Sequence, residues 1–547
     1  MSVNTVSVAD HLWSVLGQLN IKTVFGLPGT TILDALESLR AGNQLRFVSA
    51  RHEQCAGHMA DASARLSAPF GVVLVDLGPG LANTATAVLA AARDSIPLFV
   101  IAGNEERELI GREVWHEMPE LEVFGSLLKL ARRLEWAGDF PRLLREAITT
   151  CMGGRPGPVL LSVPKDLWNE PISAVGEQSV RFPALPCASN LALEATVKLM
   201  RTSARPLIVA GGGMRRSSNS SLVAFCEKFN IPVVTSPNGR GCIPEDHPLC
   251  LGHAGRFGQR QASQALADAD LLLVLGSRLS DLATHNWSLL SSGQTIIHVD
   301  VEAEMLGRQW PANEGIVSDA SLFLDALMPL LNADGWNIWD CVERSASRQK
   351  ERNLFYAIQD DILVKPQADM RALERKVGFD HTIIMGGGRF QQFVGEWQVR
   401  SPMNFFYAAN SGVVGFALSA AIGAAIEHPA RTTLCCLGDG DFMMHVQEIE
   451  TAVRTGINLK CIILNDFAFG AMKARQKVSF GTEYSNPDIE KLADAFGAAA
   501  KTVRLGAEID GAVAWLLDRS GVAILDVHMD LTENRSLMFG HDIGDRS

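Results

Sequence analysis

The sequence predicts an α/β protein built from three doubly wound parallel-sheet domains. Short apolar runs rich in strand-forming residues alternate with helical stretches, which is typical of βαβ units. This alternation occurs in three successive sets, and 547 residues are enough for three or four domains. Hydrophobic residues make up 47% and charged residues 20% of the chain, the proportions of a folded globular protein.

The first set extends from Val6 to about Pro171 and includes the runs FGVVLVDLG, PLFVIAG and GPVLLSVP. The stretch from Glu170 to Ser189 is rich in Pro, Ser and Glu and lacks periodicity, so it is interpreted as a linker. A second set follows with RPLIVAGGG, NIPVVTSP, ADLLLVLGS and QTIIHVDV and ends near Leu331. Each of these two sets predicts one α/β domain.

A polar, tryptophan-containing helical segment from Gly335 to about Gln367 leads to the third set. Its runs are TIIMGGG, MNFFYAA, TTLCCLGDGD, NLKCIILND and GVAILDVHM. We therefore place the domains at residues 1–170, 190–331 and 368–535. The three sets show no residue-level repeat.

Charge and composition argue against several classes of partner. The 49 Lys and Arg residues against 61 Asp and Glu give a net charge of −12, which disfavours nucleic acid and acidic membrane surfaces. The ten cysteines are scattered without a CxxC pair and predict reduced, buried thiols. Because the N-terminus lacks a basic signal region and no apolar run approaches the ~20 residues that a bilayer requires, we expect a cytoplasmic protein that neither spans a membrane nor is exported.

The sharpest local signal is Gly438-Asp439-Gly440, which follows the apolar run TTLCCL and precedes a helical segment. Glycines in a strand-to-helix turn allow an anion to approach the backbone N–H groups. A second strand, LKCIIL, ends in Asn465-Asp466, with 24 residues between Gly440 and Asn465. Asp439 and Asp466 should then meet at the carboxyl ends of neighbouring strands, where two oxygen ligands suit Mg²⁺. The alternative is an ordinary βα turn and a helix cap.

This arrangement resembles the thiamine diphosphate (ThDP) motif of the ThDP-dependent decarboxylases and carboligases, written GDG followed by NN. The resemblance implies that Asp439, Asp466 and the Ala468 carbonyl bind Mg²⁺. Asp466 replaces the commoner second Asn. Asp441 stands where that family often has a small residue beside the diphosphate, and a carboxylate is unfavourable there unless it turns outward or caps the helix.

The other half of the family's site lies in the first domain. RFVSARHEQCAGHMADASARL places Glu53 at a strand-to-helix junction and looks like the family's HEQxAxHMAxxxAR segment. By itself Glu53 could be an ordinary helix N-terminal acid. The resemblance implies that it hydrogen-bonds the aminopyrimidine ring of ThDP and favours the imino tautomer that deprotonates C2.

Further matches extend the resemblance from about Val6 to Met529. FGLPG at residues 25–29, GPGLAN at 78–83, DSIP at 94–97 and SGVVG at 411–415 resemble family signatures, and Val414 would be the apolar wedge under the cofactor. The cofactor contacts that this implies are Pro28, Gly29, Glu53, Asn83, Gly412, Val414, Gly438, Asp439, Gly440, Asp441, Asp466, Phe469, Gly470 and Met472. Since these enzymes build each site across two subunits, we expect at least a homodimer, with a homotetramer common.

Within the superfamily, the chain resembles the acetolactate synthase large subunit, especially in IPVVTSPNGRGCIPEDHPLCLGHAGRFG. Those enzymes bind FAD in the middle domain, while other relatives bind ADP or nothing there. Gly211-Gly212-Gly213 and Arg278 could contact such a nucleotide, so FAD stays an open alternative. A plain dehydrogenase built on these glycines lacks a convincing acidic ribose-binding residue.

Three departures from acetolactate synthase predict an altered acceptor site. Leu282 replaces the arginine that would clamp the carboxylate of the second substrate, and AMKARQK, with Gln476, replaces the segment that carries the pocket tryptophan. The first-domain segment reads Trp115-His116-Glu117, and His116 could carry a proton near neutral pH. Its alternative is a solvated loop residue.

The resemblance thus implies a ThDP- and Mg²⁺-dependent enzyme that decarboxylates a 2-oxo acid to an enamine, which then forms a C–C bond with a second carbonyl. The expected catalytic residues are Glu53, Gln54, His116 and Glu117, with Met472, Lys473 and Gln476 near the acceptor. One alternative is a decarboxylase that does not ligate, or a C–C lyase. Another is a catalytically silent ThDP-fold regulator. The C-terminal tail ENRSLMFGHDIGDRS could cover the site.

Overall fold

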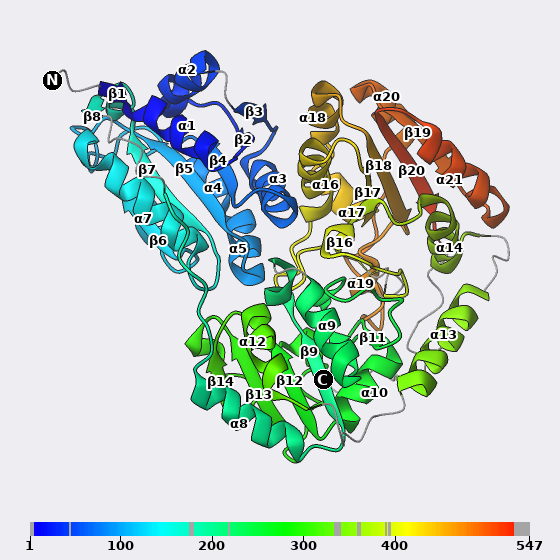
Figure 1. Ribbon diagram of the computed structural model, residues 1–547. Helices are drawn as coiled ribbons and strands as arrows, with labels where there is room; N and C mark the ends of the chain where they lie inside the picture. The colour runs from blue at the N-terminus through cyan, green and yellow to red at the C-terminus, as the bar shows by residue number, and fades with distance from the viewer. Residues whose placement is uncertain are drawn as a thin grey trace.

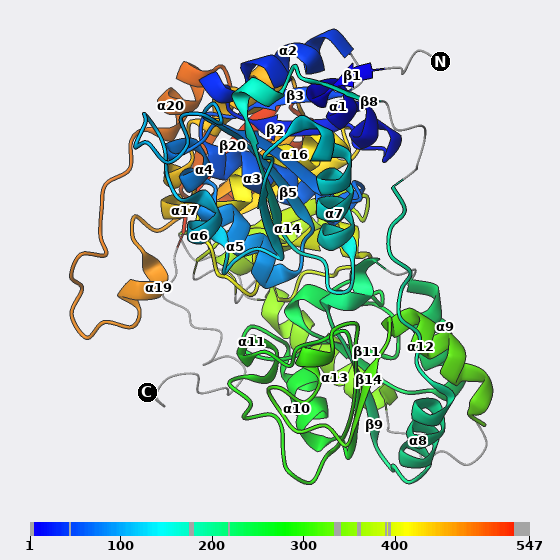
Figure 2. The same cartoon turned by 90° about the vertical axis from the view of Figure 1, so that its left-hand side faces the viewer.

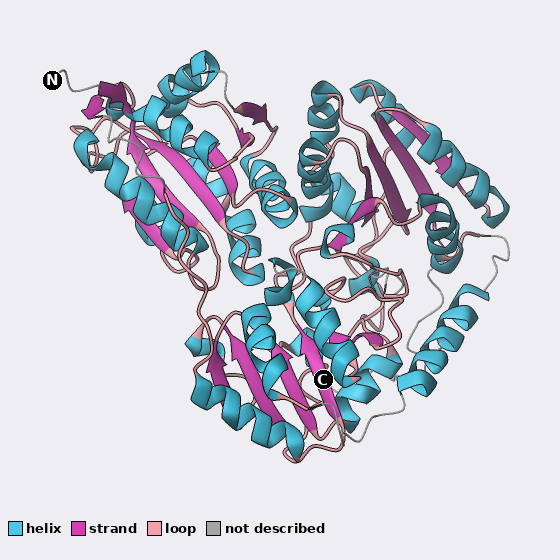
Figure 3. Ribbon diagram, viewed as in Figure 1, coloured by secondary structure: helices cyan, strands magenta, loops and turns pink. Residues whose placement is uncertain are grey.

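The computed structural model describes residues 5–42, 45–173, 180–216, 219–332, 341–357, 363–388, 391 and 395–529. It contains three six-stranded sheets in which every strand pairing is parallel, each flanked by helices (Figures 1 and 3). The predicted fold class is therefore confirmed. The C-terminal tail that was considered as a cover for the site lies outside the described residues.

The N-terminal sheet has the strand order β3-β2-β4-β5-β7-β6. Its strands are β2 (Thr23–Gly26), β3 (Arg46–Ser49), β4 (Gly71–Val75), β5 (Leu98–Asn104), β6 (Leu130–Arg133) and β7 (Val159–Pro164). Its helices are α1 (Val8–Gln18), α2 (Leu33–Gly42), α3 (Glu53–Leu66), α4 (Pro79–Asn83), α5 (Ala85–Asp94), α6 (Glu120–Phe124) and α7 (Phe140–Met152).

The start of the predicted linker forms a strand instead of a loop. Pro171–Ser173 (β8) pairs antiparallel with Thr5–Ser7 (β1). Three residues are too few to show a periodicity in the sequence, so the pairing depends on the partner strand.

The middle sheet has the order β11-β10-β9-β12-β13-β14. Its strands are β9 (Pro206–Ala210), β10 (Val233–Thr235), β11 (Cys250–His253), β12 (Leu271–Leu275), β13 (Thr295–Asp300) and β14 (Glu314–Val317). Its helices are α8 (Asn190–Arg201), α9 (Asn219–Phe229), α10 (Arg260–Asp268), α11 (Asp281–Thr284) and α12 (Ala320–Leu327). In sequence ranks this order is 3-2-1-4-5-6, that of dinucleotide-binding folds.

The C-terminal sheet has the order β16-β15-β17-β18-β20-β19. Its strands are β15 (His381–Met385), β16 (Phe405–Phe406), β17 (Thr432–Gly438), β18 (Leu459–Asn465), β19 (Ala499–Val503) and β20 (Val522–His528). Its helices are α16 (Phe416–Glu427), α17 (Asp439–Met444), α18 (Glu448–Thr455), α19 (Gly470–Lys473), α20 (Ile489–Phe496) and α21 (Ile509–Asp518). Helices α13 (Cys341–Ala357) and α14 (Pro366–Val377) precede this sheet; α13 lies within the predicted connecting segment, and α14 begins at its end.

The N- and C-terminal sheets share one strand order, 2-1-3-4-6-5 by sequence rank. Helices α3 and α16 each follow the second strand of their domain, and they pack against each other where the two domains meet (Figure 1). The contact is close, because a Cβ on Gly423 of α16 would lie 2.3 Å from the Met59 carbonyl oxygen of α3. The two outer domains therefore form a pseudo-symmetric pair that no residue-level repeat in the sequence revealed.

Asp94 joins all three domains. Its carboxylate accepts hydrogen bonds from Arg65 in the N-terminal domain (2.9 Å), Asn238 in the middle domain (2.9 Å) and Asn410 in the C-terminal domain (2.8 Å). The side chains of Asp94 and Arg65 are buried. Burial favours the neutral acid, but the Arg65 charge outweighs it and holds the pKa of Asp94 below its usual value.

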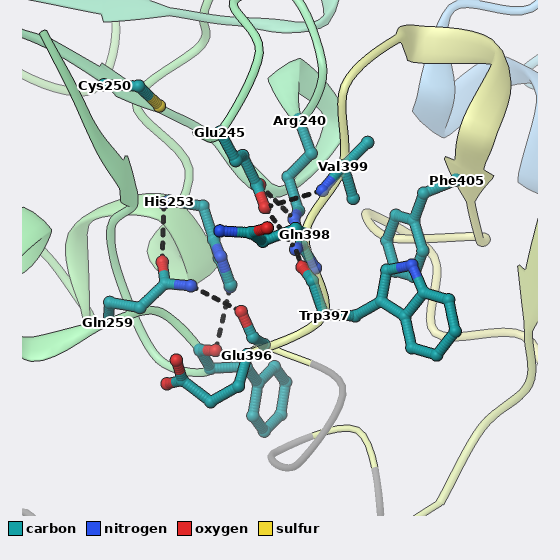
Figure 4. A network of polar contacts seen from close by, with 12 residues as sticks. Arg240, Glu245, Cys250, His253, Gln259, Glu396, Trp397, Gln398, Val399 and Phe405 are labelled. Carbon is teal, nitrogen blue, oxygen red and sulfur yellow. Dashed lines mark hydrogen bonds and ion pairs between the residues drawn. The ribbon is translucent and has the colours of Figure 1, made fainter. Parts of the chain in front are cut away.

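A second buried network connects the middle and C-terminal domains (Figure 4). Arg240 donates to both carboxylate oxygens of Glu245, at 2.7 and 2.9 Å, and also to the Trp397 carbonyl. Glu245 in turn accepts from the backbone N–H of Val399 at 3.0 Å. Because every partner is a defined hydrogen-bonding group, this ion pair fixes the orientation of the segment before β16.

The nine cysteines whose state the structure describes are free thiols, and eight of them are buried, as predicted. Cys187 is exposed, because it lies in the non-periodic stretch before α8. No helix within the described ranges combines the length and apolarity needed to cross a bilayer.

Candidate active site

The oxygen donors predicted at the C-terminal sheet gather at its carboxyl edge. β17 ends at Gly438 and β18 at Asn465, and the two strands are direct neighbours. Asn486 donates to the Asp439 carboxylate at 2.7 Å and to the Asn465 side-chain oxygen at 3.1 Å. The side-chain amide of Asn465 donates a hydrogen bond to the Asp526 carboxylate at 2.8 Å. Asn486 and Asp526 were not predicted, because a lone polar residue far along the chain carries no spacing signal.

Burial raises the pKa of Asp439, although the bond from Asn486 lowers it. Asp439 is 2% exposed. The Tyr484 hydroxyl lies beside the Asp439 carboxylate, and burial followed by the Asp439 charge raises the pKa of Tyr484. A cation beside Asp439 would offset the cost of burying its charge, and an all-oxygen donor set of this kind suits Mg²⁺.

The turn after β18 places the other two predicted metal ligands. Phe467 has φ = 55°, an uncommon conformation for a non-glycine residue, and its N–H bonds the Asn465 side chain at 3.1 Å. A Cβ on Gly470 would lie 2.0 Å from an Asp466 carboxylate oxygen, so the Asp466 side chain packs directly against the start of α19. Ala468 pairs with Glu483 in an isolated bridge whose hydrogen bonds use the carbonyls of Phe467 and Thr482.

Phe469 and Val414 line the same edge. A Cβ on Gly440 would lie 3.0 Å from the Phe469 ring and 2.8 Å from the Tyr484 hydroxyl. Val414, 40% exposed, contacts the loop after β15, where a Cβ on Gly387 would lie 3.3 Å from its side chain. Gly412 has φ = 64°, in the region that glycine favours. Met472 lies half-exposed on α19.

Asp441 neither turns outward nor caps its own helix. Its carboxylate accepts hydrogen bonds from the backbone N–H of Gly387, at 2.7 Å, and of Gly415. These glycines belong to the turns after β15 and before α16, and Asp441 is 3% exposed. Burial raises its pKa to about 7, against the two N–H bonds, which lower it. The carboxylate thus ties two glycine turns together.

At the N-terminal sheet, Glu53 begins α3 and is 8% exposed. Asn83 donates to its carboxylate at 2.9 Å, and a Cβ on Gly80 would lie 3.4 Å from its other oxygen. The segment that contains Glu53 and the GPGLAN segment that contains Asn83 are therefore adjacent. Glu53 is bonded within the N-terminal domain, and Asp439 within the C-terminal domain.

Asp76, which the sequence reasoning missed, organises the neighbouring turns. Its carboxylate accepts from the N–H of Thr31 at 3.1 Å and from the Thr31 hydroxyl. A Cβ on Gly29 would lie 2.3 Å from this carboxylate, so the turn containing Pro28 and Gly29 closes on Asp76. Its signal was available, because Asp76 directly follows the apolar strand β4.

The predicted catalytic loop covers this edge. A Cβ on Gly78 would lie 1.9 Å from the His116 carbonyl oxygen, and His116 has φ = 66°. The His116 ring is exposed beside Trp115, which is 79% exposed. The Glu117 carboxylate accepts from the N–H of Gly111 and of Val114, which lowers its pKa. Glu117 therefore orders the loop.

The remaining predicted participants are held by local contacts. Gln54 contacts the His58 ring at 3.3 Å. Gln476 bridges the loop after α19 by bonds to the backbone of Phe480, at 2.9 and 3.0 Å. Lys473 pairs with Glu483 at 2.6 Å. This loop projects from the body of the protein (Figure 2) and exposes Val478 and Phe480 by 80% and 86%.

The nucleotide site that was considered as an alternative in the middle domain is filled by backbone. The N–H of Gly211 donates to the Leu275 carbonyl at 2.8 Å, and that of Gly213 to the Gly276 carbonyl at 3.0 Å. A Cβ on Gly211 would lie 2.2 Å from the Gly276 oxygen, and Arg278 donates to the Arg93 carbonyl. These groups do not fit a dinucleotide diphosphate at the strand-order reversal.

Comparison with known families matches each domain separately. Residues 6–123 match the thiamine pyrophosphate enzyme N-terminal TPP binding domain, residues 193–327 its central domain, and residues 386–527 its C-terminal TPP binding domain. The chain is 29% identical over 567 residues to the probable acetolactate synthase large subunit of Methanococcus aeolicus, covering 97% of this chain and 93% of that protein. It is 28% identical over 555 residues to the acetolactate synthase isozyme 3 large subunit of Escherichia coli, covering 97% and 96%.

Proposed function

Because this chain belongs to the ThDP-dependent enzymes and is acetolactate synthase-like, we propose that it is a Mg²⁺-dependent carboligase. It decarboxylates a 2-oxo acid and joins the product to a second carbonyl compound, with an acceptor site unlike that of acetolactate synthase. We also propose a cytoplasmic location and the domain boundaries 1–170, 190–331 and 368–535.

One observation carries the proposal: each outer domain places its polar groups at the carboxyl edge of its sheet. Glu53 and Asn83 lie at one edge, and Asp439, Asn465 and Asn486 at the other. An acid for proton transfer and an oxygen site for a metal-bound diphosphate are the two parts that this chemistry requires.

Different residues of the chain would hold the metal ion, the cofactor rings and the transferred proton. Asp439, Asp466 and the Ala468 carbonyl would hold Mg²⁺ and through it the diphosphate, while Val414 would support the rings from below. Glu53 would hold a proton at the aminopyrimidine nitrogen, with Asn83 orienting its carboxylate. When bound, ThDP supplies the nucleophilic carbon and the electron sink for decarboxylation.

The acceptor end differs in charge from that of a carboxylate-clamping enzyme. Leu282 has no guanidinium, and the N–H of Arg256 donates to its carbonyl at 2.8 Å, which places that arginine's backbone beside α11. His116 is the proton-carrying candidate on the covering loop, with Glu117 as its positioning residue. We therefore propose an aldehyde or ketone acceptor in place of a second 2-oxo acid.

We propose a homodimer as the minimal unit and a homotetramer as the common form. Trp115, Val478 and Phe480 expose large apolar surfaces on the two loops beside the candidate site. A second subunit that covered them would bury this surface and bring its Glu53 to the metal edge of the first. FAD is not part of the proposal. The N–H groups of Gly211 and Gly213, which would face its diphosphate, bond backbone carbonyls of the middle domain instead.

The position of Asp441 favours a second candidate, a catalytically silent ThDP-fold regulator. Its carboxylate occupies two backbone N–H groups that could otherwise face a phosphate. Titration of the protein with ThDP and Mg²⁺ separates the candidates, because binding at 100 times Kd stabilises the fold by ~2.7 kcal/mol.

The direct test is mass spectrometry of products from a panel of 2-oxo acids, with and without aldehyde or ketone acceptors. The carboligase predicts an acyloin that depends on the acceptor, on ThDP and on Mg²⁺. An aldehyde as the sole product, with every acceptor, would indicate a decarboxylase that does not ligate. Absence of both stabilisation by ThDP and Mg²⁺ and any product would support the regulator.

A further inference from the structure

Two histidines and a cysteine meet where the N-terminal domain contacts the C-terminal domain. His52 precedes α3, Cys55 lies in its first turn, and His445 follows α17. One potential ligand atom from each of the three side chains lies within 4.8 Å of the others. The two imidazole rings are 5.9 Å apart between centroids.

The cluster is built by secondary structure on both sides. His52 and Cys55 are three residues apart at the start of a helix, a spacing that places both on one face. The Cys55 N–H bonds the His52 carbonyl at 3.0 Å, which fixes this turn. Nδ1 of His445 lies 2.8 Å from the Gly415 carbonyl oxygen. Such a bond keeps the proton on Nδ1 and leaves the Nε2 lone pair for another partner.

The charges around the cluster are those that a cation would compensate. Cys55 and Glu448 are both fully buried. Burial, followed by the Glu448 charge, raises the pKa of the Cys55 thiol well above its usual value, and burial raises the pKa of Glu448. Burial also lowers the pKa of His445, which keeps its imidazole in the neutral form that binds metals. Without a cation, the thiolate is strongly disfavoured.

We propose that His52, Cys55 and His445 form a Zn²⁺ site that joins the two outer domains of one chain. Two imidazoles and a thiolate are a donor set that zinc prefers, at bond lengths of roughly 2.0–2.3 Å. Those lengths place tetrahedral ligand atoms roughly 3.3–3.8 Å apart, so side-chain movements of about 1 Å or less close the site. Glu448 supplies a neighbouring negative charge.

Coordination through Nε2 of His52 requires its ring proton on Nδ1, which now accepts the N–H of Gln54 at 3.1 Å. The ion therefore replaces this helix-capping bond. Histidine is not among the preferred capping residues, so the loss is small. The site is chemically distinct from the oxygen donors at Asp439, and it does not depend on the proposed reaction.

The test uses the full-length protein, stripped with a chelator and titrated with Co²⁺ as a spectroscopic probe in excess Mg²⁺. We expect one equivalent of Co²⁺ per chain with a thiolate-to-cobalt charge-transfer band, displaced by Zn²⁺. Cys55→Ser should abolish the band, and His445→Asn should weaken Co²⁺ binding by at least about 100-fold. Cys226→Ser, a buried helical cysteine of the middle domain, is the matched control and should bind normally.

Zn²⁺ should also raise the unfolding midpoint of the wild-type protein and of the control, but not of Cys55→Ser. A wild-type spectrum without thiolate charge transfer would overturn the proposal, whatever the variants do. An unchanged band in Cys55→Ser would overturn it equally. If Cys55→Ser misfolds by circular dichroism, Cys55→Ala and the wild-type spectrum decide.

Discussion

Two glycine-rich turns at the ends of parallel strands have different partners in this protein. After β17, Gly438-Asp439-Gly440 opens onto a cluster of oxygen donors held by Asn486. After β9, Gly211-Gly212-Gly213 closes on the next turn, and two of its N–H groups bond the carbonyls of Leu275 and Gly276. Similar local sequences therefore give a candidate site in one domain and a packed joint in another.

The difference lies in the neighbouring strand. β18 ends at Asn465 and is followed by Asp466, and their side chains supply oxygen atoms at the shared edge. β12 ends at Leu275 and is followed by Gly276, whose carbonyl fills the space. A glycine turn permits a close approach, but the adjacent turn decides whether a ligand or the backbone makes it. Substitutions at the open outer edges and at the closed middle edge should therefore have different effects.

The largest effect is expected at the open edge of the N-terminal domain. Glu53→Gln should lower kcat by about 10²–10⁴-fold, because the amide cannot exchange the proton. The Kd for ThDP, measured by titration, should change little, since Asn83 and the metal edge remain. Turnover equal to that of the wild type would contradict the site.

The largest effect on stability is expected from removing the Asp94 carboxylate, which joins the three domains. Asp94→Ala removes the acceptor of Asn238 and Asn410 and leaves the buried Arg65 with Asp61 as its one remaining carboxylate partner, so it should lower the free energy of unfolding by about 3 kcal/mol. Urea denaturation at neutral pH measures this loss. Arg142→Ala, which removes an exposed pair with Asp139, is the control and should cost less than about 1 kcal/mol. Equal losses in both variants would refute the role of Asp94.

The next effect concerns Asp441 and depends on pH. The pKa of Asp441 is raised from 3.8 to about 7 in the folded state, so between these values the folded protein binds more protons than the unfolded chain. Its stability should therefore fall as pH rises through this window, by at most about 4 kcal/mol from this group. Asp441→Asn should flatten that part of the profile, measured as unfolding midpoints between about pH 4 and 8. Parallel pH profiles of the wild type and Asp441→Asn would contradict the raised pKa of Asp441.

The smallest effect sharpens the comparison between the two turns directly. Gly211→Ala should destabilise the fold by about 1–3 kcal/mol, because its Cβ meets the Gly276 oxygen, and should leave ThDP affinity unchanged. Gly440→Ala should weaken ThDP binding and change the stability of the fold little, since its Cβ meets the Tyr484 hydroxyl and the Phe469 ring at the site. Thermal unfolding with and without ThDP separates the two. Weaker ThDP binding by Gly211→Ala would contradict the closed middle edge.

Much of the architecture could be predicted from local pattern. Apolar runs such as TTLCCL and LKCIIL are buried strands, and their alternation with helices gave the three-domain α/β class. The spacing from Gly440 to Asn465 also placed both motifs at one edge, because a βαβ unit returns the chain to the same end of the sheet. Glu53 and Asn83 were named from separate segments and are in contact.

Other features depended on residues that carry no local signal. Asn486 and Asp526 complete the candidate site, yet each is a lone polar residue far along the chain. Glu117 and Gln476 were chosen for chemistry, but their side chains bond nearby backbone. A side chain's partners are set by whichever loops fold over it, and sequence spacing does not encode this.

The sequence by itself determined which segments become strands and where the chemically active residues stand along them, because hydrophobic periodicity and glycine turns act locally. Only the tertiary structure decided which glycine turn stays open, where the Asp441 carboxylate points and that His445 meets His52 and Cys55. Those outcomes require contacts between segments up to hundreds of residues apart, and burial and charge favour them only once the domains have packed.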